Sequence, residues 1–487
     1  MKEQTKAPSF WDALIPVVVL IALLAASVAL FHDDSSYGPN QIALLLATMV
    51  ATIIAMKNGH KWLEIEKGII KGISISLGAV LILLAVGALI GTWLLAGTVP
   101  SLIYFGLKLL SPSIFFAASC VICAVVSLSI GSSWTTAATI GVALMGVASG
   151  LGLSQVITAG AVVSGAYFGD KLSPLSDTTN LAPAVAGSDL FSHIRHMMWT
   201  TVPSFVLALI IFLALGFGAS GHASSARIDS ILSGLEGTFS ISIWHLVPLV
   251  VLLVLAVRKM PAFPAVFIGA LLGAVWALLF QHPLVEKLAG HTDLVSSLKL
   301  VWSTLFNGVT IETGNSTLDK LLSGGGMSSM LNTVWLIMCA MAFGAVMERT
   351  GLLRRLIQGL LGAAKSTGSL VAATIGTCIS TNILTADQYM SIVIPGRMYK
   401  EEFERRGLAP VNLSRSLEDG GTITSALVPW NTCGAYMHSV LHVSPADYIF
   451  YAFFNLINPV LAIIYAYLGI KILKLQPPHV HSSTAQQ

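Results

Sequence analysis

The stretch GAYFGDKLSPLSDTTNLAP (residues 165–183) is a polar segment inside an otherwise apolar part of the chain. It holds two acids, one base, four serine or threonine residues, an asparagine and two prolines. Proline removes a backbone donor and stops a helix, so a helix through this stretch must break near its middle. The broken ends leave amides and carbonyls unpaired, and these groups can face an ion or a small solute. The stretch therefore predicts a broken membrane crossing.

The rest of the chain is too poor in charge to make a water-facing surface. Hydrophobic residues fill 55% of the 487 positions and charged residues only 10%, against about 25% charged in soluble domains. We therefore expect an all-α protein that crosses the lipid bilayer many times. The net charge of +3 gives no sign of a nucleic-acid partner, the five cysteines lie in apolar runs, and no P-loop motif is present. We expect no cofactor.

Apolar runs long enough to cross a bilayer define the predicted crossings. The first is read as a retained helix because it is long for a signal sequence. The predicted crossings lie near 11–31, 40–56, 72–96, 197–217, 242–257, 261–280, 327–347 and 447–471. Shorter runs, interrupted by glycine and polar residues, lie near 113–149, 153–196, 366–396 and 412–446.

The two halves of the chain share landmarks in the same order. The segment 66–72 is echoed by 319–325, an offset of 253 residues (319 − 66) that also separates Ser129 from Asn382. We predict two repeats, each with about five crossings, a re-entrant hairpin and a broken helix; the odd number inverts the second repeat. The predicted domains are a first repeat at 9–217, an extracellular linker at 218–241, a second repeat at 242–474 and a cytoplasmic tail at 475–487.

The distribution of Lys and Arg predicts the orientation of the chain. With both termini in the cytoplasm, most of the 26 Lys and Arg residues fall on the inner side, as the positive-inside rule requires. Matched loops also invert their charge. The loop 349–355 is basic, whereas its partner at 96–102 carries no charge.

Polar side chains gather at four places, two in each predicted repeat. Two are hairpin tips, SIGSSWTT (129–136) and STNILTAD (380–387), and two are broken crossings, at 169–183 and 418–432. Such groups are costly in lipid unless a cavity or a partner accommodates them. The predicted ion- or substrate-binding residues are Ser132, Ser133, Thr135, Asp170, Ser173, Asp177, Thr178, Asn180, Asn382, Thr385, Asp387, Glu418, Asp419, Thr422 and Asn431.

Two of these carboxylates are the preferred Na⁺ ligands and proton carriers. Asp177 and Asp387 have no base beside them in the sequence. Desolvation disfavours a charged carboxylate, so Na⁺ and protons can compete for its oxygens. Alternative interpretations stay open for other groups: an internal Asp170–Lys171 ion pair, a solvated Glu418 at the cytoplasmic end, and hydroxyl groups that only satisfy backbone carbonyls.

Other interpretations have weaker support in the sequence. His438 and His442 are spaced as two metal ligands on one helix, but no third ligand is evident. A membrane enzyme with Ser132 or Ser133 as nucleophile lacks a nearby histidine base, and it gives no reason for two matching broken crossings. We therefore expect a transporter.

The sequence resembles the NhaC-type Na⁺/H⁺ antiporter family over nearly its whole length. The resemblance rests on GSSWTTAATIGVALMGV (131–147), the long block 157–197, TADQYMSIVIPGRMY (385–399) and SRSLEDGGTITSALVPWNTCGAYM (414–437). It implies a bacterial cytoplasmic-membrane protein with a scaffold and a mobile transport domain that moves like an elevator, and a homodimer. It also implies that Asp170, Asp177, Asn180, Asp387, Glu418 and Asp419 lie around the substrate path.

The resemblance leaves two substrates open. The leading expectation is exchange of Na⁺ for H⁺ at the buried carboxylates. The alternative is an exchanger of malate, lactate or an amino acid that couples to the same ions, since similar family members carry organic solutes. Lys171, Trp430 and Asn431 could then contact an organic anion.

Overall fold

A computed structural model describes residues 6–31, 35, 37–219, 225–313, 319, 322–362 and 364–475. Within these ranges the chain is helical and has no strands, only isolated bridges between Val309 and Gly324 and between Leu408 and Lys474. Nine of the described helices are long and apolar enough to cross a membrane, or up to 11 if each of two bent pairs is one span. The predicted class is confirmed: this is an all-helical, multi-pass membrane protein.

The first half of the chain contains three long helices, the first hairpin and the first break. Its helices are α1 (Phe10–Phe31), α2 (Pro39–Lys57), α3 (Trp62–Leu95), α4 (Thr98–Leu109), α5 (Phe115–Ile130), α6 (Ser133–Thr136), α7 (Val142–Leu151), α8 (Gln155–Leu172), α9 (Asp177–Ala186) and α10 (Leu190–Ala219). A π-helical turn, η3 (Ala137–Gly141), joins α6 to α7. A short turn, η2 (Pro112–Ile114), precedes α5.

The second half has more short helices. They are α11 (Ser225–Thr238), α12 (Val247–Val257), α13 (Ala262–Phe280), α14 (His282–Ala289), α15 (Leu294–Asn307), α17 (Leu331–Arg349), α18 (Leu352–Gly362), α19 (Thr367–Thr385), α20 (Gln388–Arg405), α21 (Pro410–Leu417), α22 (Thr432–Leu441), α23 (Pro445–Tyr448) and α24 (Phe453–Tyr467). Short turns are η4 (Ile243–Leu246), η5 (Met327–Met330), the π-helical η6 (Glu418–Thr422), η7 (Ser425–Leu427) and η8 (Ile449–Tyr451).

The sequence placed most long helices within a few residues of their observed bounds. The main difference is α3, which has 34 residues and begins at Trp62 rather than near residue 72. The sequence analysis also missed α4, α14 and α15, because these short amphipathic helices do not reach the length of a crossing. Helix α11 lies in the predicted linker. Lys320, in the predicted repeat segment 319–325, and most of the predicted tail lie outside the described residues.

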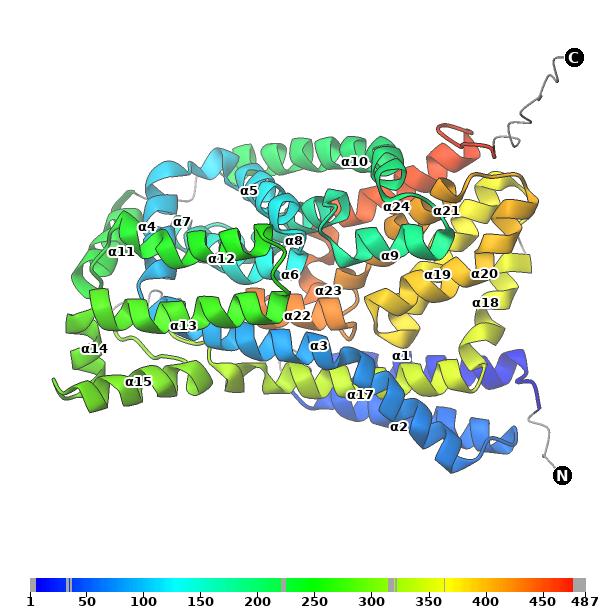
Figure 1. Cartoon of the computed structure of the whole chain (residues 1–487), viewed down its shortest axis with the longest axis horizontal. Coiled ribbons are helices and arrows are strands. Elements are labelled where there is room, and N and C mark those ends of the chain that lie inside the picture. Colours follow the sequence, from blue (N-terminus) through cyan, green and yellow to red (C-terminus); the bar gives the residue numbers. More distant parts are fainter. Residues whose placement is uncertain are drawn as a thin grey trace, which may run out of the picture.

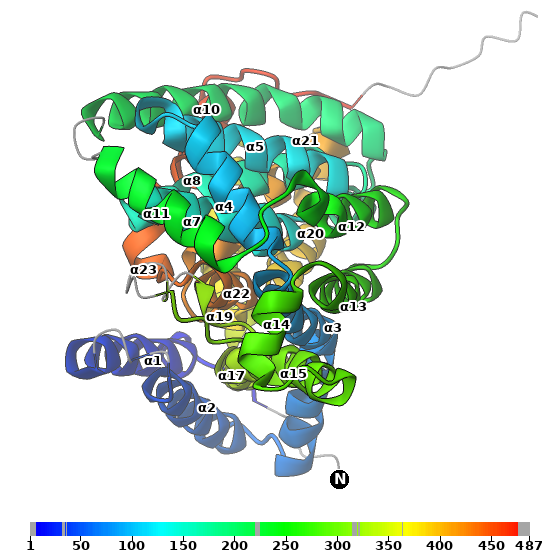
Figure 2. The same cartoon turned by 90° about the vertical axis from the view of Figure 1, so that its left-hand side faces the viewer.

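The helices form two groups, one above the other in Figure 1, and both groups extend along the longest axis of the molecule. Figures 1 and 2 both show α1, α2, α3 and α17 together on one side and α5 and α10 on the other. Helix α1 begins and α24 ends at the same end of that axis (Figure 1). The hairpin α19–α20 and the break between α8 and α9 lie between these groups (Figure 1), and the turn η6 packs against α19, α20 and α21.

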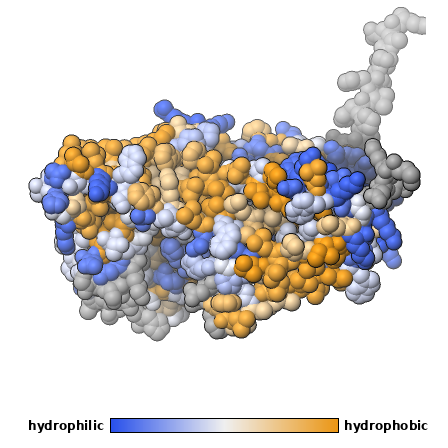
Figure 3. Space-filling view, turned by 90° about the horizontal axis from the view of Figure 1, so that it is seen from below, coloured by the Kyte–Doolittle hydropathy of each residue, from blue (hydrophilic) through white to orange (hydrophobic). Residues whose placement is uncertain are grey.

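The outer surface is apolar along the helices. Large hydrophobic side chains are exposed on α1, α2, α3, α10, α12 and α13, among them Leu30 and Phe217. On the face shown in Figure 3, hydrophobic residues cover much of the middle, and hydrophilic residues gather toward the two ends. A soluble protein would not expose so much apolar surface, so lipid must cover it.

Candidate functional site

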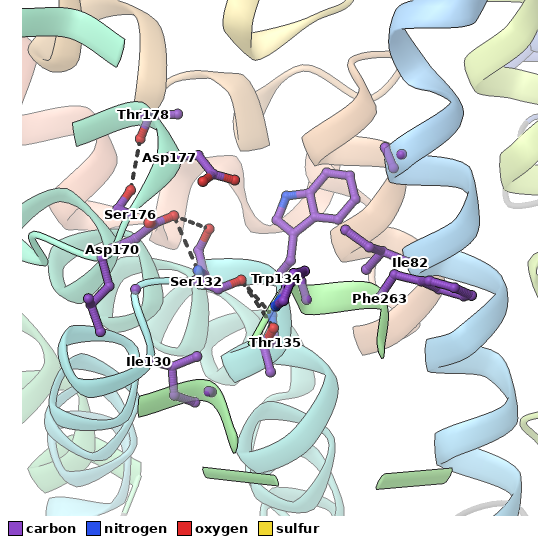
Figure 4. Close-up of a pocket in the computed structure, with 18 of the residues that line it drawn as sticks. Ile82, Ile130, Ser132, Trp134, Thr135, Asp170, Ser176, Asp177, Thr178 and Phe263 are labelled. Carbon is purple, nitrogen blue, oxygen red and sulfur yellow. Dashed lines mark hydrogen bonds between the residues drawn. The ribbon is translucent and has the colours of Figure 1, made fainter. Parts of the chain in front are cut away.

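A large cavity collects side chains from segments that are far apart in the sequence. Its volume is about 820 Å³, and it is lined by parts of α3, the α5–α6 turn, the α8–α9 break, the α12–α13 loop and the start of α20. Three carboxylates line it, those of Asp170, Asp177 and Asp387. Figure 4 shows the first two of these beside the tip residues Ser132 and Trp134.

The α5–α6 turn delivers a helix terminus and hydroxyl groups to this cavity. Gly131 ends α5 in the left-handed region, at φ 76°, and lies so close to the α8–α9 break that an added Cβ would come within 2.6 Å of the Leu175 Cβ. Ser132 then caps α6 by accepting a hydrogen bond from the Thr135 amide at 3.2 Å. Glycine is therefore needed at the turn for both its backbone and its lack of a side chain.

Asp170 is held by this turn. Its Oδ2 accepts hydrogen bonds from the Ser133 hydroxyl at 2.6 Å and from the Ser133 amide at 3.2 Å. Thr179 donates to the backbone carbonyls of Asp170 and Lys171, at 3.1 and 3.0 Å. The carboxylate therefore joins the hairpin tip to the last turn of α8 while it lines the cavity.

The break between α8 and α9 places Asp177 at the start of a helix. Ser176 caps α9 by accepting from the Thr179 amide at 3.4 Å, and its hydroxyl lies 3.2 Å from that of Thr178. Asn180 donates to the Pro174 carbonyl at 2.9 Å. Asp177 itself is exposed within the cavity lining and extends toward the side of the cavity where Trp134 lies (Figure 4). A carboxylate at a helix N-terminus is stabilised by the amides there.

The α19–α20 turn delivers the third carboxylate directly. Ala386 is left-handed, at φ 56°, and Asp387 caps α20 by accepting from the Met390 amide at 2.9 Å. The Asp387 side chain is only 3% exposed, but it lines the cavity. Its neighbours Gln388 and Tyr389 also line the cavity.

Two asparagines hold the second hairpin against the second broken segment. Asn382 donates to the Gly421 carbonyl at 2.7 Å and to the Thr424 hydroxyl at 3.0 Å. Asn431 donates to the backbone and side-chain oxygens of Asn382, each at 3.1 Å. Both asparagines are fully buried and neither lines the cavity. Their hydrogen bonds fix the relative positions of α19, η6 and α22.

The predicted site therefore divides into two sets. The residues that line the cavity are Ser132, Ser133, Thr135, Asp170, Asp177, Thr178, Asn180 and Asp387. The residues that lie outside its lining are Ser173, Asn382, Thr385, Glu418, Asp419, Thr422 and Asn431.

The suggested Asp170–Lys171 ion pair is wrong. The ammonium group of Lys171 instead forms a fully buried ion pair with Asp419, and it also donates to Asn458 at 3.0 Å. Successive residues on a helix point about 100° apart, so Asp170 faces the hairpin tip while Lys171 faces the second half of the chain. The pair joins α8 to η6.

The suggested solvated Glu418 is also wrong. Its side chain is 0% exposed, as is that of Asp419 beside it. The loop of charged residues that precedes it in the sequence ends at α21, and η6 turns inward from there. The position of Glu418 near a loop that the charge pattern assigns to the cytoplasm did not reveal this burial.

The histidine pair does not form part of a metal centre. Among the residues that the structure describes, no group of three or more His, Cys, Asp or Glu side chains could hold a metal ion. His442 ends α22 in the left-handed region, at φ 55°, so it no longer continues the helical face that carries His438. The i, i+4 spacing was therefore misleading.

The sequence analysis missed the aromatic and basic walls of the cavity. Trp134 stacks on Tyr436 with ring centroids 4.0 Å apart, and the Tyr436 hydroxyl donates to the Trp134 carbonyl at 2.9 Å. Lys259 and Phe263, from the α12–α13 loop, also line the cavity. The pattern WTT at the tip could have suggested an aromatic wall, but no local signal links the α12–α13 loop to this cavity.

Comparisons with known proteins show the family of this chain. A model of the Na⁺/H⁺ antiporter family matches residues 165–470. The Na⁺/H⁺ antiporter NhaC of Alkalihalophilus pseudofirmus is 39% identical over 464 residues, which cover 95% of this chain and 96% of that protein.

Two further relatives carry organic solutes by name. The malate-2H⁺/Na⁺-lactate antiporter of Bacillus subtilis is 36% identical and covers 96% of both chains. The arginine/ornithine antiporter ArcD of Halobacterium salinarum is 36% identical over 97% of this chain and 94% of that protein. With relatives this similar over nearly the full length, the chain belongs to the Na⁺/H⁺ antiporter family, a family of membrane transporters rather than enzymes.

Proposed function

We propose that this protein exchanges Na⁺ for H⁺ across the cytoplasmic membrane by competition at the carboxylates of the cavity. The observation that carries the proposal is the convergence of three carboxylates on one cavity from two distant segments, Asp170 and Asp177 from the α8–α9 break and Asp387 from the α19–α20 turn. Carboxylate and hydroxyl oxygens are the ligands that a hard cation prefers. The lining supplies both, with hydroxyls from Ser132, Ser133, Thr135, Ser176 and Thr178.

The exchange follows from the competition of two cations for the same oxygens. A carboxylate that lines the cavity can be neutralised either by a proton or by a bound Na⁺, whether its side chain is buried, as in Asp387, or exposed to the cavity, as in Asp177. Asp177 and Asp387 are the proposed shared ligands, and Asp170 completes the site from the position in which Ser133 holds it. If the site changes sides only when it is occupied, Na⁺ moves one way and protons the other.

The proposed motion is that of an elevator. In this proposal the helix group that contains α3 and α17 is the scaffold (Figures 1 and 2), and the other group moves together with the α19–α20 hairpin, which lies between the groups. We propose that the domains 9–217 and 242–474 are inverted repeats, joined by the linker 218–241 and followed by the tail 475–487. The similar turns at Gly131 and Ala386 support this relation. A homodimer with cytoplasmic termini completes the proposal.

An organic solute is the second candidate cargo. A cavity of about 820 Å³ far exceeds one Na⁺ and lies in the roughly 300–1,000 Å³ range of small-molecule sites. Its lining carries three carboxylates and one basic residue, Lys259. Charge complementarity then favours a solute with an ammonium group, such as an amino acid, over a dicarboxylate such as malate.

Proteoliposomes with a preset pH gradient distinguish the two candidates. Na⁺ added without any organic solute should dissipate the gradient, and Asp177→Asn should abolish this response. If Na⁺ never moves protons over the whole pH range, Na⁺/H⁺ exchange is excluded. Counterflow of labelled amino acid, malate or lactate then tests the second candidate in the same vesicles.

A further inference from the structure

One buried carboxylate outside the cavity has no partner. Glu418, the first residue of η6, is 0% exposed, and neither of its carboxyl oxygens has a hydrogen-bond partner among the described residues. The Thr422 hydroxyl, one turn further on, is the polar group that acts on this carboxyl group at close range, but the two do not meet the geometry of a hydrogen bond. Glu418 does not line the cavity that holds the other carboxylates.

The neighbouring Asp419 shows what a buried, ionised carboxylate requires. It is equally buried, but its Oδ1 accepts from Lys171 and, at 2.7 Å, from Asn458. The Thr200 hydroxyl lies 3.2 Å from Oδ2, and the Arg415 guanidinium lies 4.0 Å away. The two carboxylates are adjacent in the sequence, but only the charge of Asp419 is compensated by a cation and by hydrogen-bond donors.

Close packing keeps solvent away from Glu418. Gly420 lies against α19, where an added Cβ would come within 2.9 Å of the Ile375 Cα and 3.0 Å of the Cys378 Cβ. Gly421 lies against α20, where an added Cβ would come within 2.8 Å of the Ser391 hydroxyl. The two glycines let η6 sit between these helices without a gap for water.

Among the described residues, no cation forms an ion pair with Glu418. Lys171 of α8 acts on it electrostatically but is already paired with Asp419 and Asn458. Arg415 of α21 donates to the Lys471 carbonyl and lies 4.0 Å from the Asp419 carboxylate, and its two other guanidinium nitrogens have no hydrogen-bond partner among the described residues. The titratable or charged groups on the elements packed around η6 that act on Glu418 are Lys171, Asp170, Asp419 and the Cys378 thiol.

We propose that Glu418 is a proton-binding residue of the transport cycle, separate from the cation site in the cavity. An ionised carboxylate without partners is far too costly in a dry interior, so the group is a neutral carboxylic acid in this conformation. Its O–H bond breaks when the segment opens to water on one side, which releases H⁺ and leaves a hydrated carboxylate. A proton from the other side restores the acid. The proposal rests on the proposed exchange function.

Infrared spectroscopy of the full-length protein in lipid tests the protonation state without any transport. The wild type should show the carbonyl stretch of a protonated carboxylic acid, and Glu418→Gln should remove that band. Gln is a neutral group of the same shape, so this variant should fold. The matched control is Glu402→Gln, because Glu402 is paired with Arg405 and Arg406 and is ionised; it should leave the band unchanged. A spectrum that Glu418→Gln does not alter overturns the proposal.

Flux measurements test whether this proton is transported. Uptake of radioactive Na⁺ driven by a pH gradient should fall at least about tenfold in Glu418→Gln, whereas Na⁺/Na⁺ exchange should stay within about twofold of the wild type. Full pH-driven uptake in this variant would show that the Glu418 proton is not transported. Wild-type protein that shows neither flux would exclude the exchange function, and the infrared result on Glu418 would still stand by itself.

Discussion

The two helical hairpins use the same turn to deliver different chemistry. In each turn one left-handed residue, Gly131 at φ 76° or Ala386 at φ 56°, is followed by an extended residue that caps the next helix. The capping residue is Ser132 in the first turn and Asp387 in the second. Both turns line the same cavity.

The difference shows that the same backbone turn can place either a hydroxyl group or a carboxylate in the cavity. The neutral first turn leaves the Ser133 amide and hydroxyl free to hold the carboxylate of Asp170 from α8. The second turn needs no carboxylate from another helix, because its own capping residue, Asp387, carries one. Helix caps accept Ser and Asp about equally well, so the choice between them can follow the chemistry of the cavity.

The largest expected effect is on folding, at the first turn. Gly131→Ala places a Cβ 2.6 Å from the Leu175 Cβ at a left-handed position. Strain and overpacking together should lower the free energy of unfolding by about 3 kcal/mol, measured by thermal unfolding of the purified protein. The matched control is Gly376→Ala, where no atom lies within 4 Å of an added Cβ. Equal stability of the two variants would contradict the requirement for glycine at the turn.

The second effect is on transport, at the second turn. Asp387→Asn keeps the helix cap but removes the charge, so Na⁺-dependent proton movement should fall about 100-fold in proteoliposomes. Ser132→Thr changes the cap of the other turn without changing charge and should stay within about threefold of the wild type. If the two variants lost activity equally, the hairpins would contribute capping alone, and the comparison between their chemistries would fail.

A smaller effect is expected where the first turn holds Asp170. Ser133→Ala removes the 2.6 Å hydrogen bond to the carboxylate, which should weaken the apparent Na⁺ affinity by about tenfold, or about 1.4 kcal/mol. The measurement is the Na⁺ concentration that gives half-maximal proton movement. Ser129→Ala is the control, since the Ser129 hydroxyl bonds only to the Val125 carbonyl of its own helix. An unchanged affinity in Ser133→Ala would remove Asp170 from the cation site.

The smallest effect is expected at Ala386. Ala386→Gly removes the backbone strain of an alanine in the left-handed region, which stabilises the folded state. Glycine also gives the unfolded chain more conformational freedom, which destabilises the folded state by nearly as much. The melting temperature should therefore rise slightly, which corresponds to an increase of less than about 1 kcal/mol in the free energy of unfolding. A clear loss of stability would show that the Ala386 methyl group, which is buried, contributes packing that outweighs its backbone strain.

Local patterns in the sequence predicted the helices and much of the cavity lining. The apolar runs predicted the long crossings because burial in lipid requires a helix of about 20 apolar residues. The prolines and hydroxyl residues of 169–183 predicted a break, and the structure has one between Leu172 and Asp177. Ser132 and Asp387 were assigned to hairpin tips, and both line the cavity.

The partners of individual side chains could not be predicted in the same way. Lys171 lies next to Asp170 in the sequence but pairs with Asp419, 248 residues away. Lys259 and Phe263 reach the cavity from a loop whose own sequence carries no sign of it. Such contacts depend on how whole helices pack against one another, and a local sequence pattern does not indicate that packing.

The sequence by itself determined that this chain crosses a membrane many times, that it breaks its helices at polar segments, and that it belongs to an antiporter family. Composition and spacing settle the first two properties because lipid forbids unpaired backbone and isolated charge, whereas the family follows from the resemblance of long sequence motifs. Only the tertiary structure decided which carboxylates share a cavity and which are neutralised elsewhere. Asp419 is compensated and Glu418 is not, although they are neighbours in the chain, because burial and partners are properties of packing in three dimensions.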